Sequence, residues 1–459
     1  MATDRSAPET DEGPAPRPLP IPLVGVMAGL IVLLAVVARA QLVHHQTYDF
    51  RGFLLPWWTF IDQHGGYRAL QYKFSDYNVP YLYIMVALHA VAPHHPLAAI
   101  KVVSAGFDLV LAALMYLLIK YRRPGYRLAG AAALTVLLLP TVIMNGSLWA
   151  QCDAIYTAFL LGGMYSLIKR RPWLACTLFG VAYAFKQQAM FLFPILLVLA
   201  LRRELPWRAL VAAPAAFLLL DVPALIIGRP IGELLTIYTS QVGGYQQLAL
   251  NAPSLYALLP AELAVDEIRT AGICFAGAVV LLLVTAIAAS RQRLTPQRLV
   301  VAATLFAIAV PFLLPAMHER YFYAGDVLSV AVAFLAPRKL WFVPLLTQYA
   351  SATTYAPFLF GAKAASPQVP ALVMLAVVLV LAIHLARELY PSAPAVGPVG
   401  TAPAADEPEA AQEPAPTKAP EPAAEPEATE QRVEYVIELA GKPVEQHAEE
   451  PAERAVTPV

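Results

Sequence analysis

Charged side chains stand among aromatic rings at several places in this 459-residue chain, and some of them combine groups that could act on a substrate. In HQTYDFRGFLLPWWTFI, Asp49 lies a few residues before Trp57 and Trp58. A carboxylate packed among rings binds a proton more readily than one in water, which suits a general base. The alternative is an ordinary solvated aspartate in the belt of Trp and Tyr that marks a membrane surface.

The stretch FSDYNVPYLY places Asp76, Tyr77 and Tyr81 around a proline-containing turn. A fixed turn of this kind can present polar groups to a cavity. The same stretch also suits a helix start, because Ser75 or Asp76 can cap a helix that has Pro80 in its first turn. The two interpretations are compatible, so these side chains are candidate substrate contacts as well as candidate caps.

The stretch SLWAQCDAIY places Gln151 and Asp153 in an expected turn between two apolar helices, flanked by Trp149 and Tyr156. Aspartate is a frequent N-cap, since its oxygen accepts from the first free backbone N–H groups of a helix. An amide and a carboxylate in one turn also suit the hydroxyl groups of a sugar. The sequence leaves capping and sugar binding open at Asp153.

Cations suited to a phosphate occur in two further motifs. AFKQQAMFLFP holds Lys186 in an apolar run with no neighbouring acid, and a lysine at that depth must reach water or meet an anion. PAMHERYFYAGD groups His318, Glu319, Arg320 and Tyr321, and the planar donor fork of arginine suits phosphate oxygens. The alternative for the second motif is a self-contained Glu–Arg pair on the surface.

The elements that must position these groups are membrane helices. The chain is 58% hydrophobic and only 14% charged. Runs such as residues 21–40 match the roughly 20 residues that cross a bilayer core. An acidic, proline-rich segment precedes this first run where a signal peptide has a short basic one, so we expect a retained helix. The predicted fold is an all-α polytopic membrane bundle of about 12–13 transmembrane helices.

The basic residues predict the orientation, because they concentrate in cytoplasmic loops. Basic clusters separate the apolar runs and begin at Lys120, Lys169, Arg202, Arg291 and Pro337. Placing them inside puts both termini in the cytoplasm and turns the motifs described above outward, to one extracytoplasmic face of the plasma (inner) membrane. Residues 79–92 then have both ends outside, as a helix that dips into or lies along this face. The alternative is a true span.

Two carboxylates, Asp108 and Asp221, fall within apolar runs. A charge there is costly, so each is expected to face a partner or a cavity. The longest outward loop contains GGYQQLALNAPSLYALLP, which is either a lid on the acceptor side or an ordinary surface loop.

Three regions follow from composition: a disordered N-terminal tail (1–20), a membrane domain (21–389) and a disordered tail (390–459) rich in Pro, Ala and Glu. From Pro391 onward this last tail holds 14 acidic and 4 basic residues, too polar to form a core. Residues 431–442 could form one local element, although a piece of solvated tail is the simpler interpretation.

Several chemistries have no sequence support. Phosphate-loop, dinucleotide-binding GxGxxG and HExxH zinc motifs are missing, which disfavours a soluble nucleotide-dependent enzyme. Nothing indicates nucleic-acid binding. The cysteines Cys152, Cys176 and Cys274 are far apart and predict neither a disulfide framework nor a zinc site. No cofactor is expected, although Asp49 and Asp153 could together hold a divalent metal.

The motifs YDF…PWW, FSDYNVPYLY, GSLWAQCDAIYTAFLL, AFKQQAMFLFP and MHERYFY, in this order, resemble membrane-embedded glycosyltransferases of the GT-C superfamily, and in particular bacterial proteins similar to GPI-anchor mannosyltransferases. The resemblance covers residues 21–387. It implies an inverting transfer of a sugar, with mannose as the best match, from a polyprenyl-phosphate donor to an acceptor hydroxyl on the extracytoplasmic side. The acceptor is a glycan, a lipid or a protein. The long acidic tail departs from relatives that carry a folded C-terminal outer domain.

By the same resemblance, Asp49 matches the catalytic base and Asp153 a second acidic position. Lys186 and the group His318, Glu319 and Arg320 match positions near the lipid phosphate. Trp57, Trp58 and Tyr81 are expected to stack on the sugar or line the lipid groove.

Other protein classes remain as alternatives. A flippase or transporter of lipid-linked sugars also places polar groups inside a helical bundle, although such proteins often show paired repeats, which this sequence lacks. A scaffold that acts through its acidic tail is a weaker alternative.

Overall fold

A computed structural model describes residues 21–241, 247–260, 265–361 and 366–391. They belong to the first of two compact units, Met1–Pro394, and the second unit, Ala395–Val459, lies outside the described residues. The predictions for residues 1–20 and 392–459, including the local element at 431–442, therefore stay predictions.

The described chain is almost wholly helical, as its composition predicts. The α-helices are α1 (Ile21–Leu42), α2 (Leu55–Gln63), α3 (Val79–Val91), α4 (Pro96–Arg122), α5 (Tyr126–Leu138), α6 (Pro140–Val142), α7 (Asp153–Ile168), α8 (Pro172–Phe185), α9 (Pro194–Leu201), α10 (Ala212–Ile227), α11 (Ile231–Leu235), α12 (Val265–Ala289), α13 (Pro296–Leu313), α14 (Tyr323–Leu335), α15 (Pro337–Leu340), α16 (Val343–Phe360) and α17 (Gln368–Leu389). Two π-helical segments are η1 (Phe50–Leu54) and η3 (Ile143–Leu148). The 3₁₀ segments are η2 (Gly66–Gln71), η4 (Gln187–Leu192), η5 (Trp207–Val211), η6 (Thr239–Gln241), η7 (Leu255–Leu258) and η8 (Glu319–Phe322). The strands are β1 (Ala249–Leu250) and β2 (Met317–His318).

Within the described residues, six helices are long and apolar enough to cross a membrane, namely Pro22–Leu42, Pro96–Arg122, Trp207–Ile227, Asp266–Ala289, Pro296–Leu313 and Gln368–Leu389. A seventh crossing is formed if α5 and the segment Pro140–Leu148, bent by 48°, count as one. The chain is therefore a polytopic helical membrane protein. The count of 12–13 spans stays a prediction, because the remaining apolar helices are shorter.

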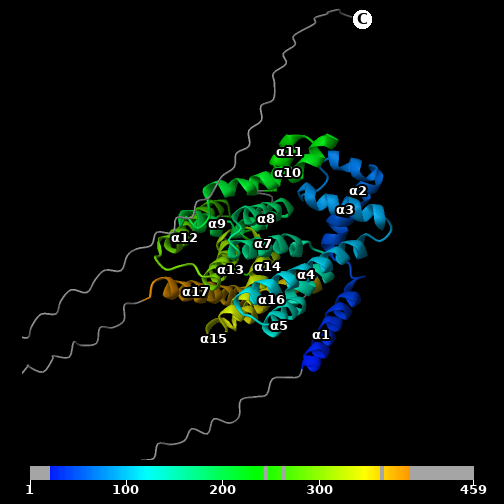
Figure 1. The fold of residues 1–459 in the computed structure, drawn as a ribbon. Coiled ribbons are helices and arrows are strands. Elements are labelled where there is room, and N and C mark those ends of the chain that lie inside the picture. Colours follow the sequence, from blue (N-terminus) through cyan, green and yellow to red (C-terminus); the bar gives the residue numbers. More distant parts are fainter. Residues whose placement is uncertain (1–20, 242–246, 261–264, 362–365, 392–459) are drawn as a thin grey trace, which may run out of the picture. The chain divides into compact units, whose positions relative to one another are not determined.

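The helices differ in how much of their surface faces outward. In the most apolar window of α1 only 6% of residues are buried, against 78% in α13. Figure 1 shows α13 and α14 among the other helices and α1 at the edge of the bundle. A helix that is apolar on all sides suits the interior of a bundle, whereas the exposed apolar surface of α1 suits contact with lipid.

Helix α3 covers the stretch that the sequence left open between a dipping helix and a span. It has 13 residues, so it is about 20 Å long at the usual rise per residue, well short of a bilayer core of about 30 Å. Its length therefore favours the dipping helix.

The two short strands join parts of the chain that are far apart. Strands β1 and β2 pair in parallel, with Ala249 opposite Met317 and Leu250 opposite His318. Asn251 also bridges to His318, and the Ala316 N–H donates to the Leu248 carbonyl at 2.7 Å. This pairing holds part of the long loop after α11 next to the MHERYFY motif.

The two carboxylates in apolar runs each meet a partner, as predicted. Asp108 on α4 accepts from Nε and Nη2 of Arg39 on α1, at 3.0 and 2.9 Å. Asp221 on α10 accepts from Nδ2 of Asn78 at 3.0 Å. The first contact links α4 to the end of α1, which precedes the YDF motif. The second links α10 to the FSDYNVPYLY motif.

Close packing of α8 against α10 predicts a stability effect at Gly180. A Cβ at this position would lie 2.1 Å from the Ala213 carbonyl oxygen, so the Gly180→Ala variant must push the two helices apart. Overpacking of this kind costs about 1–3 kcal/mol, and we expect a lower melting temperature in lipid nanodiscs. The matched control is Gly130→Ala on α5, where a Cβ meets no atom within 4 Å. Equal melting temperatures for the two variants would contradict this packing.

Candidate active site

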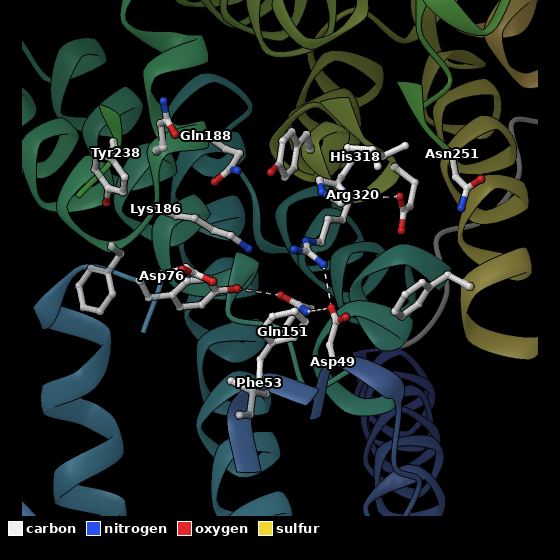
Figure 2. A pocket seen from close by; sticks show the side chains of 18 of the residues that line it. Asp49, Phe53, Asp76, Gln151, Lys186, Gln188, Tyr238, Asn251, His318 and Arg320 are labelled. Atoms are coloured by element: carbon white, nitrogen blue, oxygen red, sulfur yellow. Dashed lines mark hydrogen bonds and ion pairs between the residues drawn. The ribbon is translucent and has the colours of Figure 1, made fainter. Parts of the chain in front are cut away.

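A cavity of about 610 Å³ lies where segments far apart in the sequence come together. Each of the five quoted motifs contributes to its lining, and Figure 2 shows Asp49, Gln151, Lys186 and Arg320 around the same space. The candidate residues that line it are Asp49, Trp57, Asp76, Tyr77, Gln151, Lys186, His318, Glu319, Arg320 and Tyr321. The motifs therefore meet at one cavity, whereas their predicted position at one face of the membrane stays a prediction.

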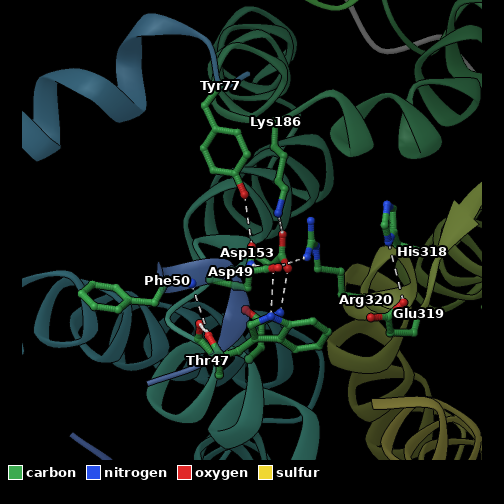
Figure 3. A network of polar contacts seen from close by, with 12 residues as sticks. Thr47, Asp49, Phe50, Tyr77, Asp153, Lys186, His318, Glu319 and Arg320 are labelled. Atoms are coloured by element: carbon green, nitrogen blue, oxygen red, sulfur yellow. Dashed lines mark hydrogen bonds and ion pairs between the residues drawn. The ribbon is translucent and has the colours of Figure 1, made fainter. Parts of the chain in front are cut away.

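Asp49 is held by three donors on a single oxygen. Its Oδ2 accepts from Trp149 Nε1 at 2.9 Å, Gln151 Nε2 at 2.7 Å and Arg320 Nη1 at 2.9 Å (Figure 3). No hydrogen bond joins Oδ1 to another described residue. The donors fix the orientation of the carboxylate, while Oδ1 stays available at the cavity. The alternative of an ordinary solvated aspartate is wrong, and donors rather than ring faces surround the group.

Irregular backbone brings Trp149 and Gln151 to Asp49. The π-helical η3 ends at Leu148, after which Ala150 adopts a left-handed φ of 65°. The Trp149 N–H donates to Met144 O at 2.8 Å and the Gln151 N–H to Asn145 O at 2.9 Å. A residue with a side chain is uncommon in this conformation, and π-helical turns frequently occur at functional sites. The turn aims two side chains of one short loop at the same carboxylate.

Asp153 and Lys186 form a buried ion pair, in which Lys186 lines the cavity and Asp153 is not part of the lining. Oδ1 of Asp153 contacts Lys186 Nζ, and Oδ2 accepts from Asn145 Nδ2 at 2.6 Å. The N-cap of α7 is Cys152, and Asp153 is the first helical residue without a side-chain capping bond. The capping interpretation of Asp153 is therefore wrong. Lys186 meets a protein carboxylate that its neighbouring sequence does not reveal.

Tyr77 and Asp76 enter the cavity from the loop before α3. The Tyr77 hydroxyl donates to Gln151 Oε1 at 3.1 Å, and Lys186 Nζ lies 5.4 Å from the centre of the Tyr77 ring. Burial raises the pKa of Tyr77 well above its usual value of 10, so the phenol stays protonated and remains a donor. Asp76 is exposed and lines the cavity.

The capping interpretation of FSDYNVPYLY is also wrong. Asn78 is the N-cap of α3, and it makes no side-chain capping bond. Ser75 instead closes a tight turn, since its hydroxyl accepts from the Tyr77 N–H at 2.9 Å. Pro80 does lie in the first turn of the helix, as predicted.

The two charged residues of the MHERYFY motif, Glu319 and Arg320, have different partners. Arg320 pairs with Asp49 rather than with Glu319, so the self-contained Glu–Arg pair is wrong. Glu319 is buried, and its Oε2 lies 3.8 Å from His318 Nδ1. Burial lowers the pKa of His318 below its usual 6.5, which makes the ring neutral at pH 7. His318 therefore offers hydrogen bonds at this pH rather than charge.

Two of the aromatic candidates lie away from the cavity. Trp57 lines it and packs on Tyr77, with ring centres 5.3 Å apart. Trp58 is buried elsewhere, where its Nε1 donates to Pro93 O at 3.1 Å beside the ring of His89. Tyr81 is buried behind Tyr77 and is not part of the lining. Trp58 and Tyr81 therefore do not line this cavity, because α2 and α3 turn them into the core, and their role at a lipid groove stays a prediction.

Several lining residues were not singled out from the sequence. They lie in loops, turns or 3₁₀ segments, and include Lys73, Gln187, Gln188, Tyr238 and Ser240. The only sequence signal was their position next to a motif, as in KQQ. The described end of the long loop also lines the cavity through Gln247, Leu250 and Asn251, which fits the lid interpretation. Residues 242–246 of that loop lie outside the described residues.

The suggested metal site fits poorly. Asp49 is paired with Arg320 and Asp153 with Lys186, so a divalent ion would have to displace both cations. No group of three His, Cys, Asp or Glu side chains suited to a metal occurs within the described ranges. Asp49 and Asp153 are therefore balanced by protein cations.

Comparisons with known proteins give structural likenesses at low identity. The chain is similar to ArnT from Cupriavidus metallidurans bound to undecaprenyl phosphate, with a TM-score of 0.46, 14% identity and coverage of 79% of this chain and 77% of that chain. It is also similar to ArnT from the same organism in the apo state, with a TM-score of 0.46, 15% identity and coverage of 80% and 78%. No family model matches the sequence, and no curated protein matches it.

The Asp153–Lys186 pair predicts a stability effect that a double variant reverses. Lys186→Met leaves Asp153 buried without its cation, and removing one member of a buried pair costs about 3–5 kcal/mol. Adding Asp153→Asn removes the uncompensated charge, so most of the lost stability should return. Thermal unfolding of both variants in nanodiscs measures this. A double variant as unstable as the single one would contradict the pairing.

Proposed function

We propose that this protein is an inverting membrane glycosyltransferase of the GT-C type that uses a polyprenyl-phosphate-linked sugar. The observation that carries this proposal is the Asp49 carboxylate, clamped through Oδ2 with Oδ1 open to the cavity, next to the guanidinium of Arg320. A base and a phosphate-binding cation side by side are what transfer from a lipid phosphate requires.

The reaction assigns each group a definite role. Asp49 Oδ1 accepts the proton of an acceptor hydroxyl while that oxygen attacks the anomeric carbon from the face opposite the phosphate. The bond from the anomeric carbon to the phosphate oxygen breaks, its electron pair leaves with the polyprenyl phosphate, and the configuration inverts. One positioned base contributes about 10²- to 10⁴-fold to such a step.

Arg320 can serve the base and the leaving phosphate together. Its Nη1 donates to Asp49, whereas its Nε is buried without a hydrogen-bond partner among the described residues. The guanidinium offers five donors, which leaves several for phosphate oxygens. Lys186 uses one contact on Asp153 and supplies further positive charge at the cavity wall. Neutral His318 adds a hydrogen-bonding group.

The cavity also suits a polyhydroxylated ligand. Amide groups of Gln187, Gln188 and Asn251 line it, and Gln188 Oε1 is buried without a partner in the described structure. Amides pair well with sugar hydroxyls, since each offers donors and an acceptor. Mannose is our first donor sugar to test, the acceptor is a glycan, lipid or protein hydroxyl, and the site faces the extracytoplasmic side of the inner membrane.

The first test measures release of polyprenyl phosphate from polyprenyl-phosphate-mannose by protein in nanodiscs, with acceptor extract. Asp49→Asn keeps the shape of the side chain and should lower turnover by about 10²- to 10⁴-fold. Asp62→Asn is the matched control, because Asp62 is an exposed aspartate of the same segment that bonds His89 and does not line the cavity. Full activity of Asp49→Asn would remove the base. No release with mannose, glucose or arabinose donors, together with transfer of intact lipid across the bilayer of proteoliposomes, would favour a flippase.

Substitutions around Asp49 should separate donor binding from base positioning. Arg320→Met removes the contact to Asp49 and the charge for phosphate, so we expect a higher KM for the donor and a lower kcat. Trp149→Phe removes the 2.9 Å bond to Asp49 and part of the ring that packs on Tyr355 and Phe358, but it keeps the Arg320 charge, so kcat should fall about two- to tenfold with little change in KM. Steady-state kinetics with varied donor measures both. Identical KM changes in the two variants would argue against a phosphate role for Arg320.

A further inference from the structure

Helix α4 carries three buried polar residues on one face. Lys101, Ser104 and Asp108 follow the spacing i, i+3, i+7, which places them on one side of a helix. Their exposed fractions are 3%, 2% and 0%. None of them lines the cavity. We call this set the α4 stripe.

Each residue of the α4 stripe is bonded to a segment that leads into the candidate active site. Lys101 Nζ donates to the carbonyls of Leu42 and His45, at 2.7 and 2.6 Å, between the end of α1 and Asp49. Ser104 Oγ donates to Gln151 O at 2.8 Å.

The third member of the α4 stripe also contacts α1 and, through Arg39, reaches α5. Asp108 binds Arg39 in the last turn of α1. The same guanidinium donates through Nη1 to Leu137 O, at 3.0 Å, near the bend that precedes η3. One helix face therefore holds both the segment that leads to Asp49 and the loop that contains Gln151.

The loop that bears Trp149 and Gln151 packs directly on the α4 stripe. A Cβ at Gly146, in η3, would lie 3.2 Å from Ser104 Cβ and 3.8 Å from Asp108 Oδ2. Such a distance is tighter than ordinary contact, so glycine permits this approach. From the other side, Thr47 Oγ1 donates to Trp149 O at 3.2 Å. The loops of Asp49 and Gln151 are thus joined to each other and to α4.

Burial makes these hydrogen bonds and the ion pair costly to break. An ammonium and a carboxylate inside an apolar helix are costly unless they are bonded, and Lys101 is matched by main-chain carbonyls rather than by a carboxylate. Moving either loop away from α4 would break these bonds and leave buried polar groups without partners. The two loops are therefore held in fixed positions on α4. A shift of about 1 Å at a reacting group is enough to lower turnover strongly.

We propose that the α4 stripe is a positioning element for catalysis, which sets the Asp49 loop against the Trp149–Gln151 loop so that Oδ2 is clamped and Oδ1 faces the acceptor. This inference rests on the proposed function of Asp49. Lys101 and Ser104 act through other residues and touch neither substrate.

The test combines kinetics with an activity-independent measurement in nanodiscs. The variants are Ser104→Ala and Lys101→Met, each alone and combined with Asp49→Asn. Ser166→Ala is the matched control for the serine, because Ser166 is buried on α7 and donates only to Gly162 O of its own helix. Lys120→Met, at the far end of α4 with its ammonium over the Tyr116 ring, is the control for the lysine. Hydrogen exchange reports the amides of residues 45–51 and 143–152.

Three results together are expected. Ser104→Ala lowers kcat about three- to tenfold with donor KM changed by less than about twofold, and Lys101→Met lowers kcat further. Neither variant lowers the residual rate of Asp49→Asn, because the positioned group is then already lost. Amide exchange rises in both segments for the stripe variants and not for the controls.

Other outcomes overturn the proposal in distinguishable ways. A kcat loss that is as large in the Asp49→Asn background shows an action that bypasses Asp49. Unchanged exchange in both segments shows that the α4 stripe does not hold the loops. A fully active Asp49→Asn variant defeats the proposed function itself, and raised exchange in the stripe variants would then leave a purely structural anchor.

Discussion

Charge compensation within an apolar bundle is the constraint on which this structure depends. Two ion pairs lie at the cavity, Arg320 with Asp49 and Lys186 with Asp153. In each pair the partners compensate charges that would be costly to bury alone. The lining carries equal numbers of carboxylates and of lysine or arginine cations, namely Asp49, Asp76 and Glu319 against Lys73, Lys186 and Arg320. A phosphate bound here would share cations that already serve protein carboxylates. Under the proposed function, phosphate binding and catalysis would therefore depend on the same few side chains.

Such pairs need a backbone that regular helices do not supply. The two π-helical segments η1 and η3 adjoin Asp49 and Trp149, and Ala150, Asn251 and Ala316 adopt left-handed conformations with φ of 65°, 55° and 58°. Each such residue costs about 1–3 kcal/mol and persists only where the surroundings hold it. Irregular backbone in a membrane protein is tolerated where it is buried in protein or lines a cavity. The irregular segments here meet that condition.

The surrounding helices supply the rigidity. The glycine contact between α8 and α10, the buried pair of Asp108 and Arg39, and the bond from Asn78 to Asp221 each connect a long helix to a neighbour or to a loop of the site. Strands β1 and β2 do the same for the long loop and MHERYFY. A small number of fixed contacts thus transmits the geometry of the bundle to the cavity.

The sequence by itself determined the class of the molecule and the identity of its polar motifs. Apolar runs of about 20 residues dictate membrane helices, since only such segments satisfy their backbone in lipid, and the basic clusters predicted that the motifs would meet at one face. Most of the candidate residues do line one cavity. Gln187, Gln188 and Ser240 also line it but could not be identified from the sequence, because nothing in their local pattern separates them from surface residues.

Only the tertiary structure decided the partners. Arg320 stands 271 residues from Asp49 and next to Glu319, yet it pairs with Asp49. Asp153 begins a helix and could cap it, but Lys186, 33 residues away, takes its carboxylate. Trp58 and Tyr81 belong to promising motifs and still point into the core. The reason is physical: the energy of a buried charge or ring depends on what surrounds it in space, and chain neighbours supply only part of those surroundings.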